Sequence, residues 1–230
     1  MPWRNVATLS ERPLGWYRVF VHSSTVAGSL VTLVHPPFMA AFLSLVVVGA
    51  MGVGYDPTFL LLSLLAVGLL LYAEHMLDDT TMVGKPWETE LSDRTLVLAA
   101  AVLLVLAGLV GAYASVLLGD ILPLLGVVVG AVFSVLYGLE VWEFHRVSFG
   151  ALGMAAITAF SHLVQARVLG VAAQPALVAL VFVLGLTYSY VMLALYEHTK
   201  SSAHALAWSL LGLHFITVYV LATIVLLQFA

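Results

Sequence analysis

The sequence predicts an all-α, polytopic membrane protein, a helical bundle with about seven transmembrane helices. Two compositional observations support this: of the 230 residues, 63% are hydrophobic and 9% are charged, and the mean hydropathy is +1.11. Soluble domains carry about a quarter charged residues, so this composition excludes an ordinary soluble fold. The third observation is a series of apolar runs close to the ~20 residues that a helix needs to cross a bilayer.

The apolar runs define seven expected spans. They cover residues 36–53, 58–76, 95–118, 121–139, 147–166, 175–196 and 205–229. We therefore expect residues 36–230 to form one transmembrane helical domain. Residues 1–35 form an N-terminal cytoplasmic or interfacial segment. Within it, residues 14–34 either lie in the interface as an amphipathic helix or lengthen the first span.

Several classes of protein and site are excluded by what the sequence lacks. There is no cysteine, so disulfides and thiolate metal sites cannot form. The first residues lack the short apolar core of a signal peptide, so we expect no cleaved leader. No basic patch is present, so nucleic acid is not an expected partner. Membrane lipid is the expected surrounding, and the oligomeric state is left open.

The distribution of charge predicts the orientation. With seven spans, the N-terminus and the second–third, fourth–fifth and sixth–seventh connections share one side of the membrane. That side holds seven of the eight basic residues, and only Arg167 lies on the other. The positive-inside rule places the first side in the cytoplasm, so we expect an integral protein of the cell membrane with its N-terminus inside. All acidic residues except Asp56 and Asp120 share this side, so chemistry is expected there.

The first polar cluster is "AEHMLDDTTM", residues 73–82. On a helix, Glu74 and Asp78 are i, i+4 neighbours, as are His75 and Asp79. Two carboxylates at this spacing can hold a hard cation such as Mg²⁺. An added imidazole suits Zn, Fe or Mn. The alternative is an ordinary solvated helix end.

The second cluster is "YGLEVWEFHR", residues 137–146, at the end of the fourth span. Glu140 and Glu143 are i, i+3 neighbours, and His145 follows them. Together they could contribute metal ligands. The alternative is an aromatic interfacial belt with a surface ion pair between Glu143 and Arg146.

The third cluster is "YEHTKSSAH", residues 196–204, at the end of the sixth span. Glu197, His198 and His204 could join the same metal site. The alternative is a local pair between Glu197 and Lys200 before the next helix begins. Deeper in the spans lie His162 and His214, each either a site residue or an interhelical hydrogen-bond donor.

The order of these clusters resembles the UbiA superfamily of intramembrane prenyltransferases. The resemblance is carried by "HPPFMAAFLSLVVVGA", "EHMLDD", "GKPWETELSDRTL", "VLYGLEVWEFHR" and "YEHTKSSAHALAWSLLG", in that order along most of the chain. It implies a UbiA-like fold. It also implies a Mg²⁺-dependent enzyme that transfers a prenyl group from an isoprenoid diphosphate to a lipophilic acceptor.

The resemblance also implies roles for single residues. Glu74, Asp78 and Glu197 correspond to metal-binding acids of the two acidic motifs, and Tyr137 to a fourth-helix tyrosine of the site. The basic residues expected to neutralise the diphosphate are Lys85, Arg94, Arg146 and Lys200. The full set of candidate metal ligands is Glu74, His75, Asp78, Asp79, Glu140, Glu143, His145, Glu197, His198 and His204.

Departures from the family pattern motivate two alternatives. The family's Asn-Asp opening reads Glu74-His75 here, and the family's nine helices become seven. Three Glu/His pairs now stand at helix ends, a ligand set typical of di-iron and zinc sites. One alternative is therefore a transition-metal enzyme that oxidises, hydrates or cyclises a lipid or isoprenoid. The other is a non-catalytic membrane subunit.

Overall fold

The computed structural model describes residues 26–34, 36–81, 91–141 and 146–199. All regular secondary structure in these residues is helical, and they contain no strand. The helices are α2 (Val26–Leu33), α3 (Pro36–Met51), α4 (Pro57–Thr81), α5 (Asp93–Leu118), α6 (Leu122–Gly138), α7 (Val147–Val168) and α8 (Pro175–Thr199). The prediction of an all-α fold is confirmed for this part of the chain.

Four helices are long and apolar enough to cross a membrane: α4, α5, α7 and the Pro175–Ala194 part of α8. Of the other three, α3 and α6 coincide with predicted spans but are shorter apolar helices, and α2 has eight residues. The protein is therefore a helical membrane protein. The expected seventh span, 205–229, lies outside the described residues. One boundary differs clearly from the prediction, because α4 continues to Thr81 instead of ending at Met76.

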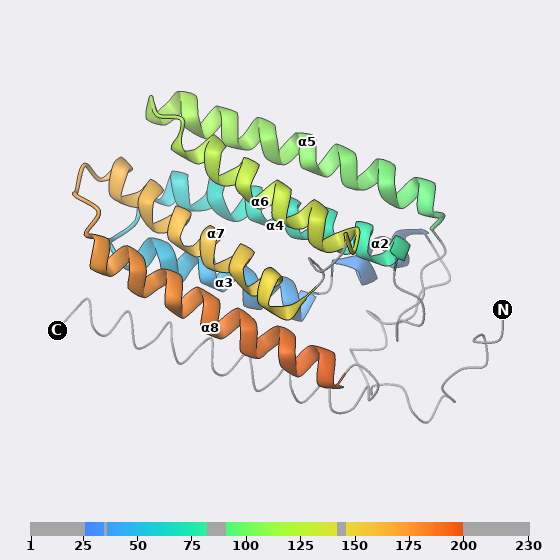
Figure 1. The fold of residues 1–230 in the computed structure, drawn as a ribbon. Coiled ribbons are helices and arrows are strands. Elements are labelled where there is room, and N and C mark those ends of the chain that lie inside the picture. Colours follow the sequence, from blue (N-terminus) through green and yellow to red (C-terminus); the bar gives the residue numbers. More distant parts are fainter. Residues whose placement is uncertain (1–25, 35, 82–90, 142–145, 200–230) are drawn as a thin grey trace.

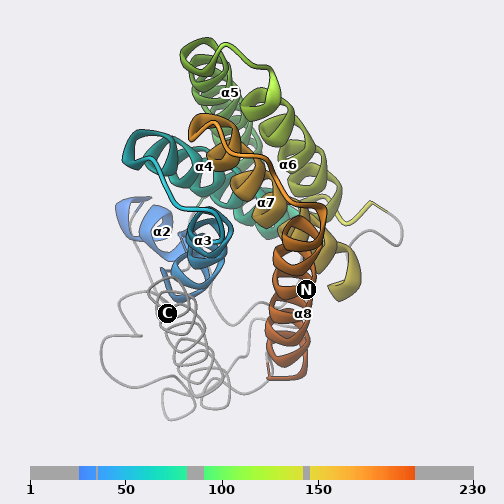
Figure 2. The same cartoon turned by 90° about the vertical axis from the view of Figure 1, so that its left-hand side faces the viewer.

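The helices lie side by side with their axes roughly aligned (Figure 1). The view along the bundle shows α4 and α7 in the middle, α5 and α6 on one side of them, and α3 and α8 on the other (Figure 2). One end of the bundle carries Thr81, Asp93, Gly138 and Arg146, and we call it the charged end. The opposite end carries the α3–α4, α5–α6 and α7–α8 connections.

The outer surface of the bundle is strongly apolar along α5. This helix has 26 residues, which corresponds to ~39 Å of length. Its exposed residues include Leu98, Val102, Val105, Leu109 and Tyr113. An apolar stripe that runs the length of such a helix would be unstable in water and is suited to contact with lipid.

Helix α7 is held in the centre of the bundle by a row of buried polar side chains. Ser161 Oγ donates to the Val46 carbonyl (2.7 Å), and His162 Nδ1 lies 3.1 Å from the Gly49 carbonyl oxygen. Both acceptors belong to α3. The Gly49 carbonyl lies in the last turn of α3, where carbonyls run out of partners within the helix, and His162 binds it. Since a carbonyl only accepts, the proton of this imidazole lies on Nδ1.

Two further polar links tie α7 to its neighbours at the opposite end. The Gln165 amide oxygen accepts from the Asp56 backbone N–H (2.7 Å), directly before α4. Arg167 Nε donates to Asp120 Oδ2 (2.7 Å) in the α5–α6 turn. The hydrogen bond from the Leu122 N–H to Asp120, helped by the pairing with Arg167, holds the pKa of Asp120 below its usual value. The opposite end is thus closed by polar contacts between connections.

The contact between α3 and α7 generates a stability prediction. A Cβ added at Gly49 would overlap the Thr158 carbonyl oxygen and lie 3.1 Å from Ser161 Cβ. Backbone atoms cannot rotate away, so Gly49→Ala should lower the free energy of unfolding by ~2 kcal/mol or more. The measurement is unfolding in mixed micelles. The matched control is Gly108→Ala on α5, where an added Cβ meets nothing within 4 Å. Equal stability of the two variants would contradict the packing described here.

Candidate functional site

The charged end is organised by a backbone contact between α4 and α6. A Cβ at Gly138 would lie 2.8 Å from the Glu74 carbonyl oxygen and 2.9 Å from Leu77 Cβ, so only glycine allows this approach. Thr81 Oγ1 shares its hydrogen bond between the carbonyls of Asp78 (3.2 Å) and Gly138 (3.3 Å). The end of the first polar cluster therefore meets the start of the second.

Tyr137 links the ends of α6, α7 and α8. A Cβ at Gly150, in the first turn of α7, would lie 2.8 Å from the Tyr137 ring and 2.9 Å from Leu193 Cδ1. The ring of Tyr137 is therefore packed against the start of α7, beside the last turns of α8. Glu197 follows Leu193 by one helical turn on α8. The predicted Tyr137 position thus lies at the junction of three helix ends.

His75 and Tyr72 bind the last turn of α2. His75 Nδ1 lies 3.2 Å from the Leu33 carbonyl oxygen, and Tyr72 Oη donates to the Leu30 carbonyl (2.8 Å). Both acceptors are terminal carbonyls of α2 that lack i+4 partners. Histidines that bind metals commonly donate their second ring N–H to a carbonyl in this way. The contact therefore fits either a structural capping role or a ligand role for His75.

Glu140 adopts a backbone conformation that is unusual for its residue type. Its φ is +49°, in the left-handed region, and it is the one non-glycine residue with positive φ among the described residues. It follows α6 in a Schellman turn, with hydrogen bonds from Glu140 N to Tyr137 O (3.1 Å) and from Val141 N to Leu136 O (3.2 Å). The equivalent position after α5 is Gly119 and after α7 is Gly170. Only at the charged end does this turn carry a carboxylate.

The two described basic residues of the site stand at helix starts. Arg94 is in the first turn of α5, after the N-cap Ser92, whose Oγ accepts from the Thr95 N–H (3.3 Å). Arg146 precedes α7, and its carbonyl accepts from the Phe149 N–H (2.9 Å). Both arginine side chains are exposed. They lie at the same end of the bundle as the acids of α4 and α6.

Several predicted site residues lie outside the described residues. These are Lys85, Glu143, His145, Lys200 and His204. Glu197 and His198 belong to the last turn of α8, but their side chains are not described. Within the part of the chain that the structure describes, no three His, Asp or Glu side chains form a group that could hold a metal ion. The predicted metal site would therefore need residues from outside this part.

The sequence reasoning missed several residues that organise the ends of the bundle. Gln165, Thr81 and Tyr72 all make cross-helix hydrogen bonds, and Gly138 sets the approach of α6 to α4. Gln165 and Tyr72 are polar residues within apolar spans, which is a detectable signal. The close approach at Gly138 has no comparable signal, because it depends on which helices become neighbours. His162 proves to be an interhelical donor to Gly49, one of its two expected roles.

Comparisons with family models, with curated proteins and with solved structures give no match. The interpretation of the charged end therefore rests on its residues and their arrangement.

The backbone of Glu140 generates a second stability prediction. An L-residue in the left-handed region is destabilised by ~1 kcal/mol relative to glycine. Glu140→Gly should therefore be more stable than Glu140→Ala by about that amount. Both variants lack the carboxylate, so their difference in unfolding free energy isolates the backbone term. A Glu140→Ala protein as stable as Glu140→Gly would show that the left-handed conformation is absent.

Proposed function

We propose that the protein is an intramembrane, metal-dependent, prenyltransferase-like enzyme that acts on an isoprenoid diphosphate and a lipophilic acceptor. The observation that carries the proposal is the contact of α4 and α6 at Gly138. It brings the acidic end of α4 against the turn that contains Glu140. The residues that resemble the first acidic motif and the fourth-helix motif of the UbiA superfamily therefore lie in contact at the charged end.

The side chains of the charged end are better suited to binding a diphosphate together with Mg²⁺ than to binding a diphosphate without a metal. Among the described side chains, this end carries five carboxylates and two guanidinium groups. The carboxylates are Glu74, Asp78, Asp79, Asp93 and Glu140, and the guanidinium groups are Arg94 and Arg146. Carboxylate oxygens and substrate phosphates are the usual ligands of Mg²⁺. An excess of acids would repel a diphosphate unless divalent cations accompany it.

Each group then has a chemical role. Glu74, Asp78 and Glu140 would contribute to a Mg²⁺ site together with acids whose side chains are not described, such as Glu143 and Glu197. The bound ion would supply positive charge to the leaving diphosphate. Arg94 and Arg146, with Lys85 and Lys200 from outside the described residues, would bind phosphate oxygens. In the transfer, the bond from the prenyl carbon to the diphosphate oxygen breaks. A new bond to the acceptor forms, and the acceptor loses one proton. Tyr137 and the apolar helix faces beside it would keep water from the reacting carbon.

The proposal also states which side of the membrane the charged end faces. The charged end would face the cytoplasm, where soluble Mg²⁺ and diphosphate esters are present, as the excess of basic residues on that side favours. The apolar chains of donor and acceptor would remain in the lipid phase. Both substrates could therefore reach the enzyme without leaving the membrane.

Pyrophosphate release tests this function. Purified protein with a prenyl diphosphate, a panel of aromatic and lipid acceptors and Mg²⁺ should release pyrophosphate. Glu74→Gln and Asp78→Asn should each lower the rate by about 100-fold or more, the scale on which removal of one electrostatic stabiliser acts. The matched control is Asp93→Asn, an exposed acid in the first turn of α5 at the same end. The control should keep most of the activity.

Two outcomes would count against the enzyme. One is the absence of both release and diphosphate binding with every acceptor tested, which would leave the transition-metal enzyme and the non-catalytic membrane subunit. The other is equal loss of activity in Asp93→Asn and Asp78→Asn. That result would mean that general surface charge, and not the α4–α6 junction, matters.

A second candidate function is a transition-metal enzyme on the same helices. The observation that favours it is the His75 Nδ1 contact with the Leu33 carbonyl, the orientation common to metal-binding histidines. This candidate predicts stoichiometric Fe, Zn or Mn in protein purified without chelators. The metal should be lost in a His75→Gln variant. It should be kept in a His162→Gln variant, since His162 is buried against α3, away from the charged end. Protein without bound transition metal would eliminate this candidate.

A further inference from the structure

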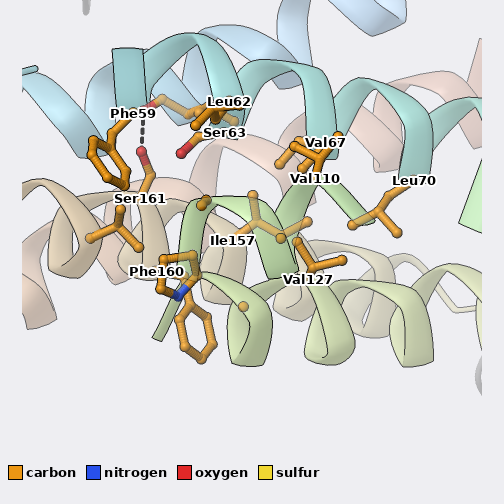
Figure 3. A pocket seen from close by; sticks show the side chains of 17 residues that line it. Phe59, Leu62, Ser63, Val67, Leu70, Val110, Val127, Ile157, Phe160 and Ser161 are labelled. Atoms are coloured by element: carbon orange, nitrogen blue, oxygen red, sulfur yellow. Dashed lines mark hydrogen bonds between the residues drawn. The ribbon is translucent and has the colours of Figure 1, made fainter. Parts of the chain in front are cut away.

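Hydroxyl groups link neighbouring helices of this bundle at two levels. In the interior, Ser161 Oγ of α7 donates to the Val46 carbonyl of α3 (2.7 Å; dashed line in Figure 3), beside a small apolar pocket of about 50 Å³. At the charged end, Thr81 Oγ1 of α4 donates to the carbonyl of Gly138, the last residue of α6 (3.3 Å). The second link joins the two segments that carry the described candidate metal ligands.

The C-terminus of α4 lacks the basic side chain that often stabilises a helix end. The partial negative charge of the last carbonyls favours a cation nearby, but the last turn of α4 contains no basic residue. Two hydroxyls donate to these carbonyls instead. Thr80 Oγ1 binds Leu77 O (2.6 Å), and Thr81 Oγ1 binds Asp78 O (3.2 Å). The two adjacent threonines therefore make the same i−3 contact within α4.

The hydroxyl of Thr81 also reaches a second helix. Among the described residues, the hydroxyl of Thr80 binds Leu77 alone, whereas that of Thr81 is shared between Asp78 and Gly138. A Cβ added at Gly138 would lie 2.9 Å from Leu77 Cβ, so α6 touches α4 at this level. Thr81 thus adds a hydrogen bond to a contact that the glycine makes possible.

The acids on both sides of this link are partly removed from water. Four acidic residues at the charged end are half-buried: Glu74, Asp78, Asp79 and Glu140. Asp93, at the same end, is exposed. Like charges repel more strongly where water is partly excluded. A fixed backbone is therefore needed to keep these carboxylates close enough to share a cation.

We propose that Thr81 is a positioning residue, whose hydroxyl fixes the turn that carries Glu140 against the acidic end of α4. The inference rests on the function proposed above, because it concerns how the same Mg²⁺ site is assembled. Gly138 precedes Glu140 by two residues, so the hydrogen bond acts on the backbone of that turn. A displacement of about 1 Å can lower a catalytic rate about 100-fold. Thr81 acts through the acids and does not bind the ion itself.

Substitutions of similar volume test the role of the hydroxyl. Thr81→Val should lower kcat for pyrophosphate release about tenfold, the effect expected from one lost hydrogen bond. The affinity of the purified protein for Mn²⁺, measured by electron paramagnetic resonance as a probe of the Mg²⁺ site, should fall by a similar factor. Thr81→Ser keeps the hydroxyl and should restore most of both.

The matched control is Thr80→Val, which removes the neighbouring hydroxyl and its bond within α4. It should destabilise the protein about as much as Thr81→Val does, because each variant loses one bond to a terminal carbonyl. Its kcat and its affinity for Mn²⁺ should remain near the wild-type values. Equal losses of kcat and Mn²⁺ affinity in the two variants would overturn the inference, because both hydroxyls would then act only as caps of α4.

The positioning role and the proposed function can fail separately. If the wild-type protein binds Mn²⁺ but releases no pyrophosphate, the proposed reaction is wrong. The Mn²⁺ affinities of Thr81→Val and Thr80→Val then still decide the positioning role. If the wild-type protein releases pyrophosphate and Thr81→Val does so at the same rate, only the positioning role is overturned. A wild-type protein that binds no Mn²⁺ would overturn both.

Discussion

The arrangement of this bundle depends on the polar and close-packed contacts of α7. Inside a bilayer, burial of one apolar side chain against another gains little over contact with lipid, so apolar surface alone does not select neighbours. Helix α7 supplies the missing specificity through Ser161 and His162, which bind carbonyls of α3. Gly49 of α3 and Gly185 of α8 both lie against Thr158 of α7 and allow the backbones to approach.

The contacts of α7 also distinguish the two ends of the bundle. At the opposite end, α7 is tied to the connections around it by Gln165 and Arg167, while the interior below them contains a cavity. At the charged end, the helices meet more closely, with Gly138 against the backbone of α4. One half therefore keeps a small apolar pocket between its helices, and the other brings the polar ends of α4 and α6 together.

Much of the fold could be predicted from sequence because long apolar runs have few alternatives to membrane helices. The gathering of Glu74, Arg94, Tyr137, Glu140 and Arg146 at one end also follows from the alternating direction of successive spans. The helix α4 extends beyond the expected span, 58–76, to Thr81, so the acids and His75 lie on it as their i, i+4 spacing assumes. The cavity could not be predicted. Small residues on a helix can either mark tight packing or leave space, and only the helix positions show which: at Gly111 an added Cβ would lie 2.8 Å from Val127 Cγ2, so this glycine marks tight packing.

The turns that follow α5, α6 and α7 differ in the residue that adopts the left-handed backbone. Among the helix ends that the structure describes, three have the same kind of turn, and two of these turns, at Gly119 and Gly170, use the residue that favours a left-handed backbone. The third places Glu140 in that conformation, although glycine would be more stable there. A destabilising residue at a position where glycine fits is commonly found at functional sites. The left-handed backbone of Glu140, beside the acidic last turns of α4, is one of the observations that support its proposed role in binding.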